Sequence, residues 1–136
     1  MLDTPLVDAA FLTKLGLKPE QRLSLVRAPE AWQRALSLLT PVNGRSISKA
    51  GVILVWLQPK DDLRKVFDRL EAAIPPDGAI WAVIPKKSAL TKGEAAVEWA
   101  AMQAAGFASG RLVDNKELRF DDRYYGTRFV VRRERR

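Results

Sequence analysis

The chain has 136 residues, of which 47% are hydrophobic, and this is enough to build one buried core. It contains no cysteine and no histidine, which excludes disulfides, thiolate nucleophiles, imidazole bases and Cys/His metal sites. The 23 Lys and Arg residues against 16 Asp and Glu residues leave a formal net charge of +7, which favours anionic partners. We therefore expect one globular domain over residues 1–136, with no metal site.

The first residues show no basic start followed by a long apolar run, as a signal peptide would, and no later apolar run is long enough for a membrane span. We expect a cytoplasmic protein that does not contact a membrane. Its expected oligomeric state is a monomer or a small homo-oligomer.

The first third of the chain predicts a helix, a strand and a second helix. Thr4 before Pro5 suits a helix N-cap with proline at the first helical position, and Gly16 suits the C-terminal stop. An alternating apolar strand follows over residues 23–28, and Pro29 again suits a first helical position. The apolar face of this second helix comprises Trp32, Ala35, Leu36 and Leu39.

The middle of the chain predicts a loop, a buried strand and a helix. Residues 41–50 are polar and contain an Asn-Gly pair, which is typical of a loop with at most a short strand. Residues 51–57 read GVILVWL, a continuous apolar run typical of a strand covered on both faces. Asp61 and Asp62 open a helix that ends at Pro75 and Pro76. Its apolar stripe is Leu63, Val66, Phe67, Leu70 and Ile74.

The last part predicts a second buried strand, a helix and a hairpin. Residues 78–84 form the strand, and Thr91 with Glu94 forms a capping box that starts an alanine-rich helix ending near Gly106. Residues 111–120 and 124–132 are strand-like, and Asp121 and Asp122 serve as turn formers between them. This order predicts an α/β three-layer Rossmann-like sandwich, with a mostly parallel sheet and a C-terminal antiparallel hairpin.

Three stretches carry a resemblance to a known fold. Residues 15–29 read LGLKPEQRLSLVRAP, residues 74–88 read IPPDGAIWAVIPKKS, and residues 106–133 read GFASGRLVDNKELRFDDRYYGTRFVVRR. They resemble the first strand and loop, the penultimate helix-to-strand turn and the terminal hairpin of class I S-adenosylmethionine-dependent methyltransferases, in reduced form. Residues 14–32, 80–88 and 118–130 together resemble a small bacterial family of uncharacterised domains, domain of unknown function 3052. That second resemblance implies the fold and no established activity.

The methyltransferase resemblance stops at the cofactor site. That family places a glycine-rich loop after its first strand so that the backbone can approach the cofactor. Here Arg27, Ala28, Pro29 and Glu30 occupy the loop, and Pro29 also removes a backbone donor. The acidic residue that would hold a ribose after the second strand has no counterpart in residues 41–50. We therefore expect no cofactor, with S-adenosylmethionine binding lost.

One candidate site lies at the carboxyl ends of the parallel strands, where ligands bind in open α/β sheets. Residues 27–30, 58–60 and 85–88 would meet at one rim. Lys86 and Lys87 would hold a phosphate or another anion, with Ser88 as a hydroxyl donor and Glu30 as the only acid nearby. The alternative, which we favour, is a solvated loop whose lysines keep the rim soluble.

A second candidate site is the basic tail. Its arginines lie near Tyr124 and Tyr125 in the sequence, and basic side chains mixed with aromatic rings bind nucleic acid through phosphates and stacking. The candidate residues are Arg128, Arg132, Arg133, Arg135 and Arg136. The alternative, which we favour, is a charged edge strand that resists aggregation, followed by a frayed end. We expect weak, sequence-independent nucleic-acid binding at most.

Two functions remain open. The first is a non-catalytic, methyltransferase-like module that binds an anionic or macromolecular partner, and it implies no catalytic residue. The second is a small enzyme or ligand-binding protein that uses the rim. A deep pocket at the rim favours the second, and a filled or shallow rim favours the first. Trp56 and Trp81 lie inside apolar strands, so core packing explains them better than ligand stacking.

Overall fold

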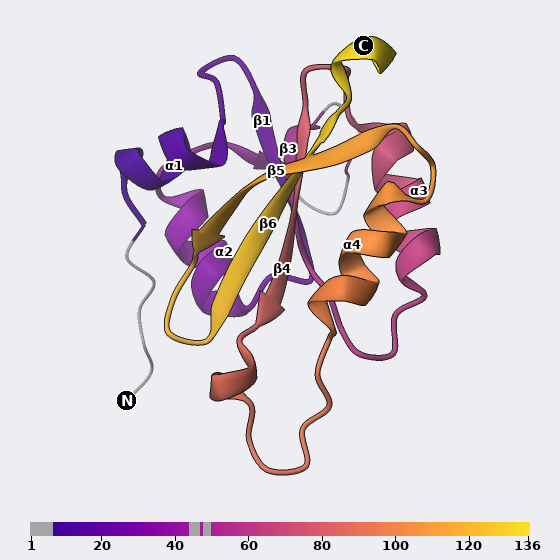
Figure 1. Cartoon of the computed structure of the whole chain (residues 1–136). Helices are drawn as coiled ribbons and strands as arrows, with labels where there is room; N and C mark the ends of the chain where they lie inside the picture. Colours follow the sequence, from indigo (N-terminus) through magenta and orange to yellow (C-terminus); the bar gives the residue numbers. More distant parts are fainter. Residues whose placement is uncertain (1–6, 44–46, 48–49) are drawn as a thin grey trace.

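The computed structural model describes residues 7–43, 47 and 50–136, and the strands of these residues form one six-stranded sheet in the order β2-β1-β3-β4-β6-β5 (Figure 1). The four strands β2, β1, β3 and β4 are mutually parallel, whereas β6 is antiparallel to both β4 and β5. This mixed sheet confirms the predicted parallel sheet with a C-terminal hairpin. The strands are β1 (Arg22–Val26), β2 (Val42–Asn43), β3 (Ala50–Trp56), β4 (Ala79–Pro85), β5 (Leu112–Arg119) and β6 (Tyr124–Val131).

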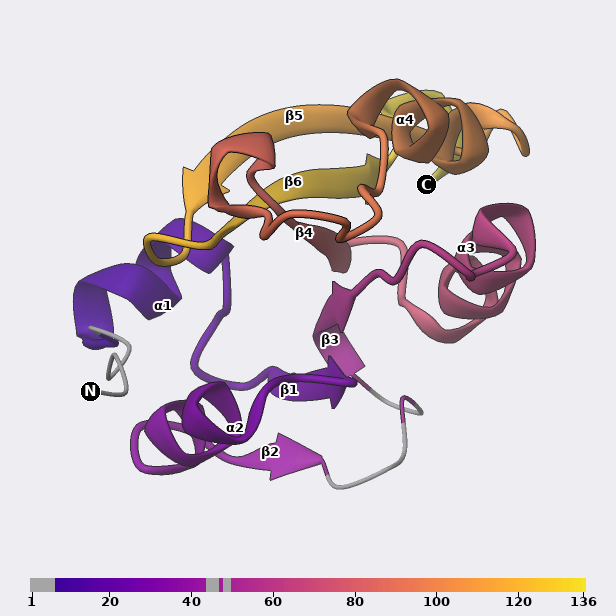
Figure 2. The ribbon, with the colours of Figure 1, turned by 90° about the horizontal axis from the view of Figure 1, so that it is seen from below.

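Helices cover both faces of the sheet, so the three-layer prediction is confirmed. Helices α1 and α2 lie on one side of the sheet, and α3 and α4 lie on the other (Figure 2). No helix in the described part of the chain has the length and apolar character needed to cross a membrane. The helices are α1 (Ala9–Leu15), α2 (Glu30–Ser37), α3 (Leu63–Ala73) and α4 (Trp99–Phe107), with short 3₁₀ turns η1 (Lys87–Ala89) and η2 (Arg133–Arg135).

Strands β3 and β4 occupy the middle of the sheet. Every residue of β3 is buried, and so is every residue of β4 except Pro85. A strand with a helix layer on each face has no solvent side, which is why both sequences are continuous apolar runs rather than alternating ones. The predictions for these two strands are confirmed.

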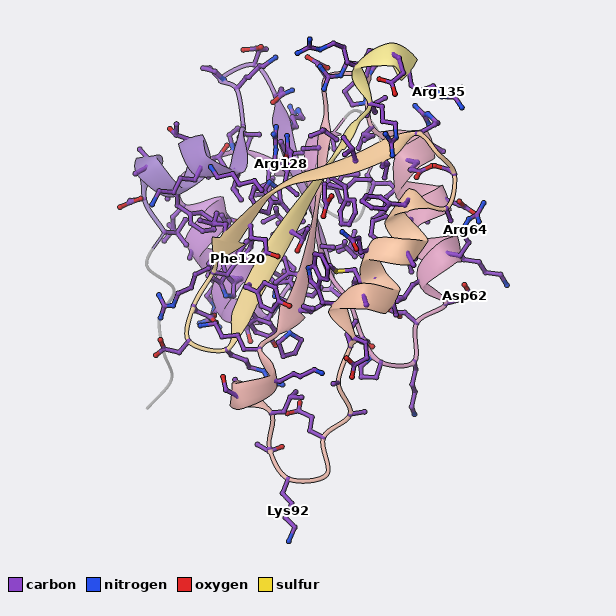
Figure 3. The ribbon with its side chains drawn as sticks, in the orientation of Figure 1. Asp62, Arg64, Lys92, Phe120, Arg128 and Arg135 are labelled. Atoms are coloured by element: carbon purple, nitrogen blue, oxygen red, sulfur yellow. The ribbon has the colours of Figure 1, made fainter. Side chains whose placement is uncertain are left out.

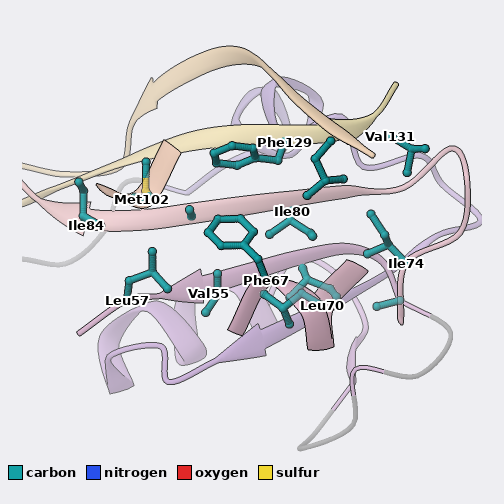
Figure 4. Close-up of a cluster of buried hydrophobic side chains, with 14 of the residues drawn as sticks. Val55, Leu57, Phe67, Leu70, Ile74, Ile80, Ile84, Met102, Phe129 and Val131 are labelled. Carbon is teal, nitrogen blue, oxygen red and sulfur yellow. The ribbon is translucent and has the colours of Figure 1, made fainter. Parts of the chain in front are cut away.

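Two apolar cores lie on the two faces of the sheet. The core under α3 and α4 is centred on Phe67 and Phe129, whose rings meet edge to face at 5.0 Å (Figure 4). The core under α1 and α2 is aromatic, and Phe120 stands 5.2 Å from the rings of both Phe11 and Trp32. Buried aromatic side chains stabilise a fold because they remove a large apolar area from water and because their rings attract one another in edge-to-face arrangements.

Three of the four tryptophans also bond through their indole N–H groups. Trp32 donates to Asp121, Trp81 donates to the carbonyl oxygen of Leu15, and Trp99 donates to Thr127. These bonds join helices and hairpin to the sheet, because a buried indole N–H needs an acceptor. The sequence prediction that Trp81 is a packing residue is confirmed.

The ends of the first two helices differ from the prediction in detail. Helix α1 is capped by Asp8, whose carboxylate accepts the Phe11 N–H, and it ends at Gly16 with the predicted left-handed backbone, φ 79°. Thr4 and Pro5 lie outside the described residues. Pro29 is the N-cap residue of α2 rather than its first helical residue.

The predicted apolar face of α2 is partly wrong. Trp32 and Leu36 are buried as expected, but the helix ends at Ser37. Leu39 therefore falls outside the helical repeat, and 43% of it is exposed. The helical spacing of apolar residues predicts burial only for residues that lie within the helix.

The start of α4 is also wrong in the sequence prediction. Glu94 does accept the backbone N–H of Thr91, as in a capping box, and it also accepts the Thr91 hydroxyl, but the helix begins only at Trp99. Gly93 adopts a left-handed conformation, φ 83°, which is incompatible with a helix, and the Glu94 carboxylate also binds Arg123. The local capping contact forms without the helix that normally follows it.

The closing hairpin turns as predicted. One carboxylate oxygen of Asp121 accepts the backbone N–H groups of Arg123 and Tyr124, each at 2.8 Å. The expectation of a charged edge strand for residues 124–132 is wrong, since β6 lies between β4 and β5 and the edge strand is β5. Strand β6 therefore needs no protection against edge pairing, and its Thr127, Phe129 and Val131 are buried.

Candidate functional site

The carboxyl ends of three parallel strands form one edge of the sheet, which we call the strand-end rim (residues 27–30, 58–60 and 85–88). Strand β3 pairs with β1 on one side and with β4 on the other, so the segments that follow them are neighbours. This is the arrangement expected from the sequence. It is also the edge at which ligands bind in open α/β sheets.

Arg27 is the first residue after β1 and has an unusual backbone. Its φ of 57° is the only positive value for a non-glycine residue in the part of the chain that the structure describes. The left-handed region costs a residue with a Cβ atom about 1 to 2 kcal/mol, which surrounding contacts must offset. Arg27 therefore holds, at the end of β1, a conformation that glycine adopts without strain.

The contacts of Arg27 are with Asp61, in the loop between β3 and α3. Its Nη1 atom donates to Oδ1 of Asp61 at 2.7 Å, and its Nη2 atom donates to Oδ2 at 2.6 Å. Oδ2 also accepts the backbone N–H of Gln58 at 2.8 Å. This forked ion pair ties the end of β1 to the segment after β3.

Both members of the pair are charged at neutral pH. Hydrogen bonds from Arg27 lower the pKa of Asp61, and they outweigh the opposing effect of partial burial. The hydrogen bond to Asp61 likewise raises the pKa of Arg27. Only 12% of the Asp61 side chain is exposed, so water screens the pair less than a surface ion pair.

Arg27 lines three hollows at this edge of the sheet. The largest, about 510 Å³, lies between β1, β2 and α2 and is lined by Leu25, Gln33 and Asn43 among others, and none of its described lining residues carries a carboxylate. The second, about 380 Å³, lies against α3, where Lys65 and Arg69 line it. The third is described next. Arg27 is therefore the residue that these three hollows share.

The third hollow, of about 250 Å³, lies between the ends of β3 and β4 and the closing hairpin. Trp56 and Tyr124 line it, together with a second ion pair between Arg123 and Glu94. The hydrogen bond from Arg123 lowers the pKa of Glu94. The Nε1 atom of Trp56 is buried and has no hydrogen-bond partner among the described residues.

The four rim residues singled out from the sequence do not line these three hollows. Glu30 pairs with Arg34 one helical turn away, and Lys87 pairs with Glu98 at 3.0 Å. The backbone N–H of Lys86 donates to the carbonyl oxygen of Arg123 at 2.8 Å, and Ser88 is exposed in η1. The structure thus places these side chains on the outside of the rim.

The expectation that Glu30 is the only acid near the rim is wrong. Asp61 and Glu94 both lie there, and each binds an arginine. The sequence predicts that Asp61 and Asp62 open α3, and Asp62 alone caps that helix by accepting the Lys65 N–H. The signal for Asp61 was its place three residues after Gln58, directly beyond a buried strand. No local signal pointed to Arg123, because its partner is 29 residues away.

Four of the tail arginines, Arg132, Arg133, Arg135 and Arg136, follow the end of β6 that lies opposite its tyrosines, whereas Arg128 lies in the middle of the strand and pairs with Trp81. Tyr124 pairs with Pro85 and Tyr125 with Ile84 at the strand-end rim, whereas Val130 pairs with Ala79 at the other end of β4. Figure 3 shows Arg135 at the end of the molecule opposite Lys92, which is in the loop beyond the rim. The expected mixing of these tyrosines with the arginines at positions 132–136 is therefore wrong, because an extended strand separates them.

Comparison with known proteins identifies the fold and no family. No family model matches the chain, and no curated protein matches it. Solved structures do match it. An S-adenosylmethionine-dependent methyltransferase from Aquifex aeolicus is 15% identical, covering 90% of this chain and 88% of its own, with a TM-score of 0.58. The CcbJ methyltransferase from Streptomyces caelestis is 11% identical, covering 91% and 93%, with a TM-score of 0.55.

A third similar structure is the N-methyltransferase NodS from Bradyrhizobium japonicum, at 14% identity, with 90% of this chain and 93% of that chain covered and a TM-score of 0.55. The sheet, the two helix layers and these matches define the class: the chain has a methyltransferase-like α/β fold. Identities this low establish a common fold, and a fold alone does not assign an activity.

Proposed function

We propose that the chain is a non-catalytic module of methyltransferase-like fold that binds an anionic or macromolecular partner and does not bind S-adenosylmethionine in the usual way. The observation that carries the proposal is the Arg27–Asp61 ion pair at the end of β1. In methyltransferases of this fold, glycines at that place let the backbone approach the cofactor. Here an arginine side chain and its carboxylate partner occupy it.

Two further features support the loss of the cofactor. Pro29 precedes α2 and has no backbone N–H to offer at the start of that helix. The short strand β2 ends at Asn43, and among the described residues that line the 510 Å³ hollow beside it, none is an acid that would accept the hydroxyl groups of a ribose. Membership of the bacterial domain of unknown function 3052 family, proposed from the sequence motifs, is compatible with this function.

Titration calorimetry with S-adenosylmethionine tests the negative half of the proposal. We expect no saturable heat with the full chain. Dissociation in the micromolar range, which corresponds to roughly 8 kcal/mol of binding free energy, would overturn it. The double variant Arg27→Ala with Asp61→Ala is the matched control, because it removes the ion pair together with the hydrogen bond from Gln58 to Asp61.

The positive half concerns the anionic partner. Eight ion pairs join described residues, and none of them involves an arginine of the tail. Uncompensated positive charge attracts anionic surfaces over distances of about a Debye length. Affinity capture with the full chain tests this: a genuine anionic partner is retained at low salt and released at high salt, whereas a partner retained at both contradicts it.

A small-molecule function is the second candidate, and the 510 Å³ hollow favours it. Its volume falls within the roughly 300–1,000 Å³ typical of small-ligand sites. A thermal-shift screen of small metabolites separates the two candidates. A stabilising compound whose effect disappears on replacing Gln33, which lines the hollow, with leucine would favour the small-ligand function over partner binding.

A further inference from the structure

One arginine within β6 and four that follow the strand form a cluster that we call the basic end: Arg128, Arg132, Arg133, Arg135 and Arg136. Residues 128–136 hold these five arginines and a single acid, Glu134, so they account for four of the seven net positive charges of the chain. Figure 3 shows Arg128 on β6 and Arg135 beside the C-terminus. The excess charge of the protein is therefore concentrated at one place.

The basic end is not neutralised within the protein. None of the five arginines forms an ion pair with a described carboxylate, whereas eight other basic residues do. Arg133, Arg135 and Arg136 are exposed, and Arg132 is half-buried. Their guanidinium groups are available to an external anion without the breaking of an internal pair.

Two of these arginines also contact other parts of the fold. Arg128 packs against the end of α1, where a carbon atom added at Gly16 would lie 2.7 Å from its Nη2 atom, and its buried Nε atom has no hydrogen-bond partner within the described part of the chain. Arg136 folds back, donating from Nε to the carbonyl oxygen of Val131 at 2.9 Å. Burial and the charge of Arg136 lower the pKa of Arg128.

We propose that the basic end binds the phosphodiester backbone of a nucleic acid, without reading its sequence. The inference rests on the proposed function, because it names the anionic partner. Guanidinium groups bind phosphate oxygens in a forked geometry, and all five cations are arginines. A nucleic acid also releases condensed counterions on binding, a source of free energy that an acidic protein surface provides to a much smaller extent.

The same geometry explains the absence of sequence reading. Tyr124 and Tyr125, the aromatic residues available for stacking on this strand, lie at its opposite end beside β4 residues Pro85 and Ile84. The helical part of the tail is the three-residue turn η2, which is too short to present a row of side chains to base edges. Contacts with phosphates alone position a nucleic acid but do not select a sequence.

Binding of a fluorescent single-stranded oligonucleotide to the full chain, measured over a series of salt concentrations, tests the inference. The variant Arg132→Gln, Arg133→Gln, Arg135→Gln loses three charges at the basic end. The control Arg34→Gln, Arg64→Gln, Arg119→Gln loses three exposed arginines that pair with carboxylates elsewhere. Because both variants have the same net charge, a difference between them is local.

We expect the slope of log affinity against log salt to fall by about 2 in the tail variant, since each lost phosphate contact removes about 0.7 for a single strand. The slope of the control variant should differ from the wild-type slope by less than about 0.35, which corresponds to half of one phosphate contact. Equal slopes for all three proteins overturn the inference. Thermal melting verifies that both variants fold.

Poly-glutamate, titrated in parallel, separates failure of the inference from failure of the proposed function. Binding of the oligonucleotide that depends on the tail supports both. Tail-dependent binding of poly-glutamate without binding of the oligonucleotide overturns the nucleic-acid inference and leaves an acidic protein as the partner. Binding of neither polymer at low salt overturns the inference and the anionic partner together.

Discussion

The guanidinium of Arg27 and the carboxylate of Asp61 are joined by two hydrogen bonds, of 2.7 and 2.6 Å, across the ends of two neighbouring parallel strands. This pair holds residue 27 in a left-handed conformation, with φ 57°. The side chain of residue 27 therefore stabilises the rim, whereas its backbone conformation opposes folding. Substitutions at this position separate the two contributions.

We expect Arg27→Gly to be more stable than Arg27→Ala by about 1 kcal/mol, although both lose the ion pair. Alanine keeps a Cβ atom in the left-handed region, and glycine does not. Both should be less stable than the wild type, because Asp61 loses its charged donor. Urea unfolding followed by tryptophan fluorescence measures the difference. Equal free energies of unfolding for the two variants would mean that the backbone relaxes once the arginine is removed.

The stability of the protein in acid should depend on Asp61. Hydrogen bonds from Arg27 hold its pKa in the folded state below the ordinary value of 3.8, so the unfolded state takes up the proton first as the pH falls. The stabilisation is fully present above the ordinary pKa and is lost as the pH falls through the lower, folded pKa. Wild type should therefore lose more unfolding free energy between about pH 6 and about pH 3 than Asp61→Asn.

The matched control for this measurement is Asp68→Asn. Asp68 pairs with Arg64 on the exposed side of α3, and half of its side chain is accessible to solvent. Exposed pairs of this kind contribute little. Asp68→Asn should lose as much unfolding free energy in acid as the wild type does. If Asp61→Asn also loses as much as the wild type, the assignment to Asp61 is contradicted.

Arg123 should hold the loop after β4 in place. Its side chain binds Glu94 and donates to the carbonyl oxygen of Ala89, and its carbonyl oxygen accepts the N–H of Lys86. In Arg123→Gln, we expect trypsin to cleave after Lys92 several-fold faster, because local opening of the loop becomes easier. Mass spectrometry of the fragments over time measures the rate.

Arg119→Gln is the control for the loop, since Arg119 belongs to the same hairpin but pairs with Asp122 beside it. Its cleavage rate at Lys92 should match that of the wild type. If Arg123→Gln also leaves that rate unchanged, the ion pair with Glu94 does not hold the loop.

Gly106 in α4 should resist the usual stabilisation by alanine. A carbon atom added there would lie 2.5 Å from the ring of Phe129, which is fully buried in the core. We expect Gly106→Ala to lower the free energy of unfolding by about 1 to 3 kcal/mol, although alanine favours a helix by about 1 kcal/mol. In a Phe129→Leu background, the cost should shrink, and a double-mutant cycle measures this coupling. Additive effects would contradict a direct clash.

Much of the fold was predictable because the signals are local. The apolar runs of β3 and β4 indicate strands covered on both faces, and Asp121 in a polar turn between two strand-like segments indicates the hairpin. Gly16 ends α1 because a left-handed residue closes a helix wherever the helix lies. Each of these features depends on a few neighbouring residues.

Tertiary contacts decided what those neighbours could not. Glu94 forms its predicted contact with Thr91, yet α4 starts at Trp99, since a glycine in the left-handed region and a carboxylate bound to Arg123 prevent an earlier start. The partners Arg27 and Asp61 are 34 residues apart, and strand order alone brings them together. A charge signals that a partner is needed, but only the folded chain determines which charge is within hydrogen-bonding distance.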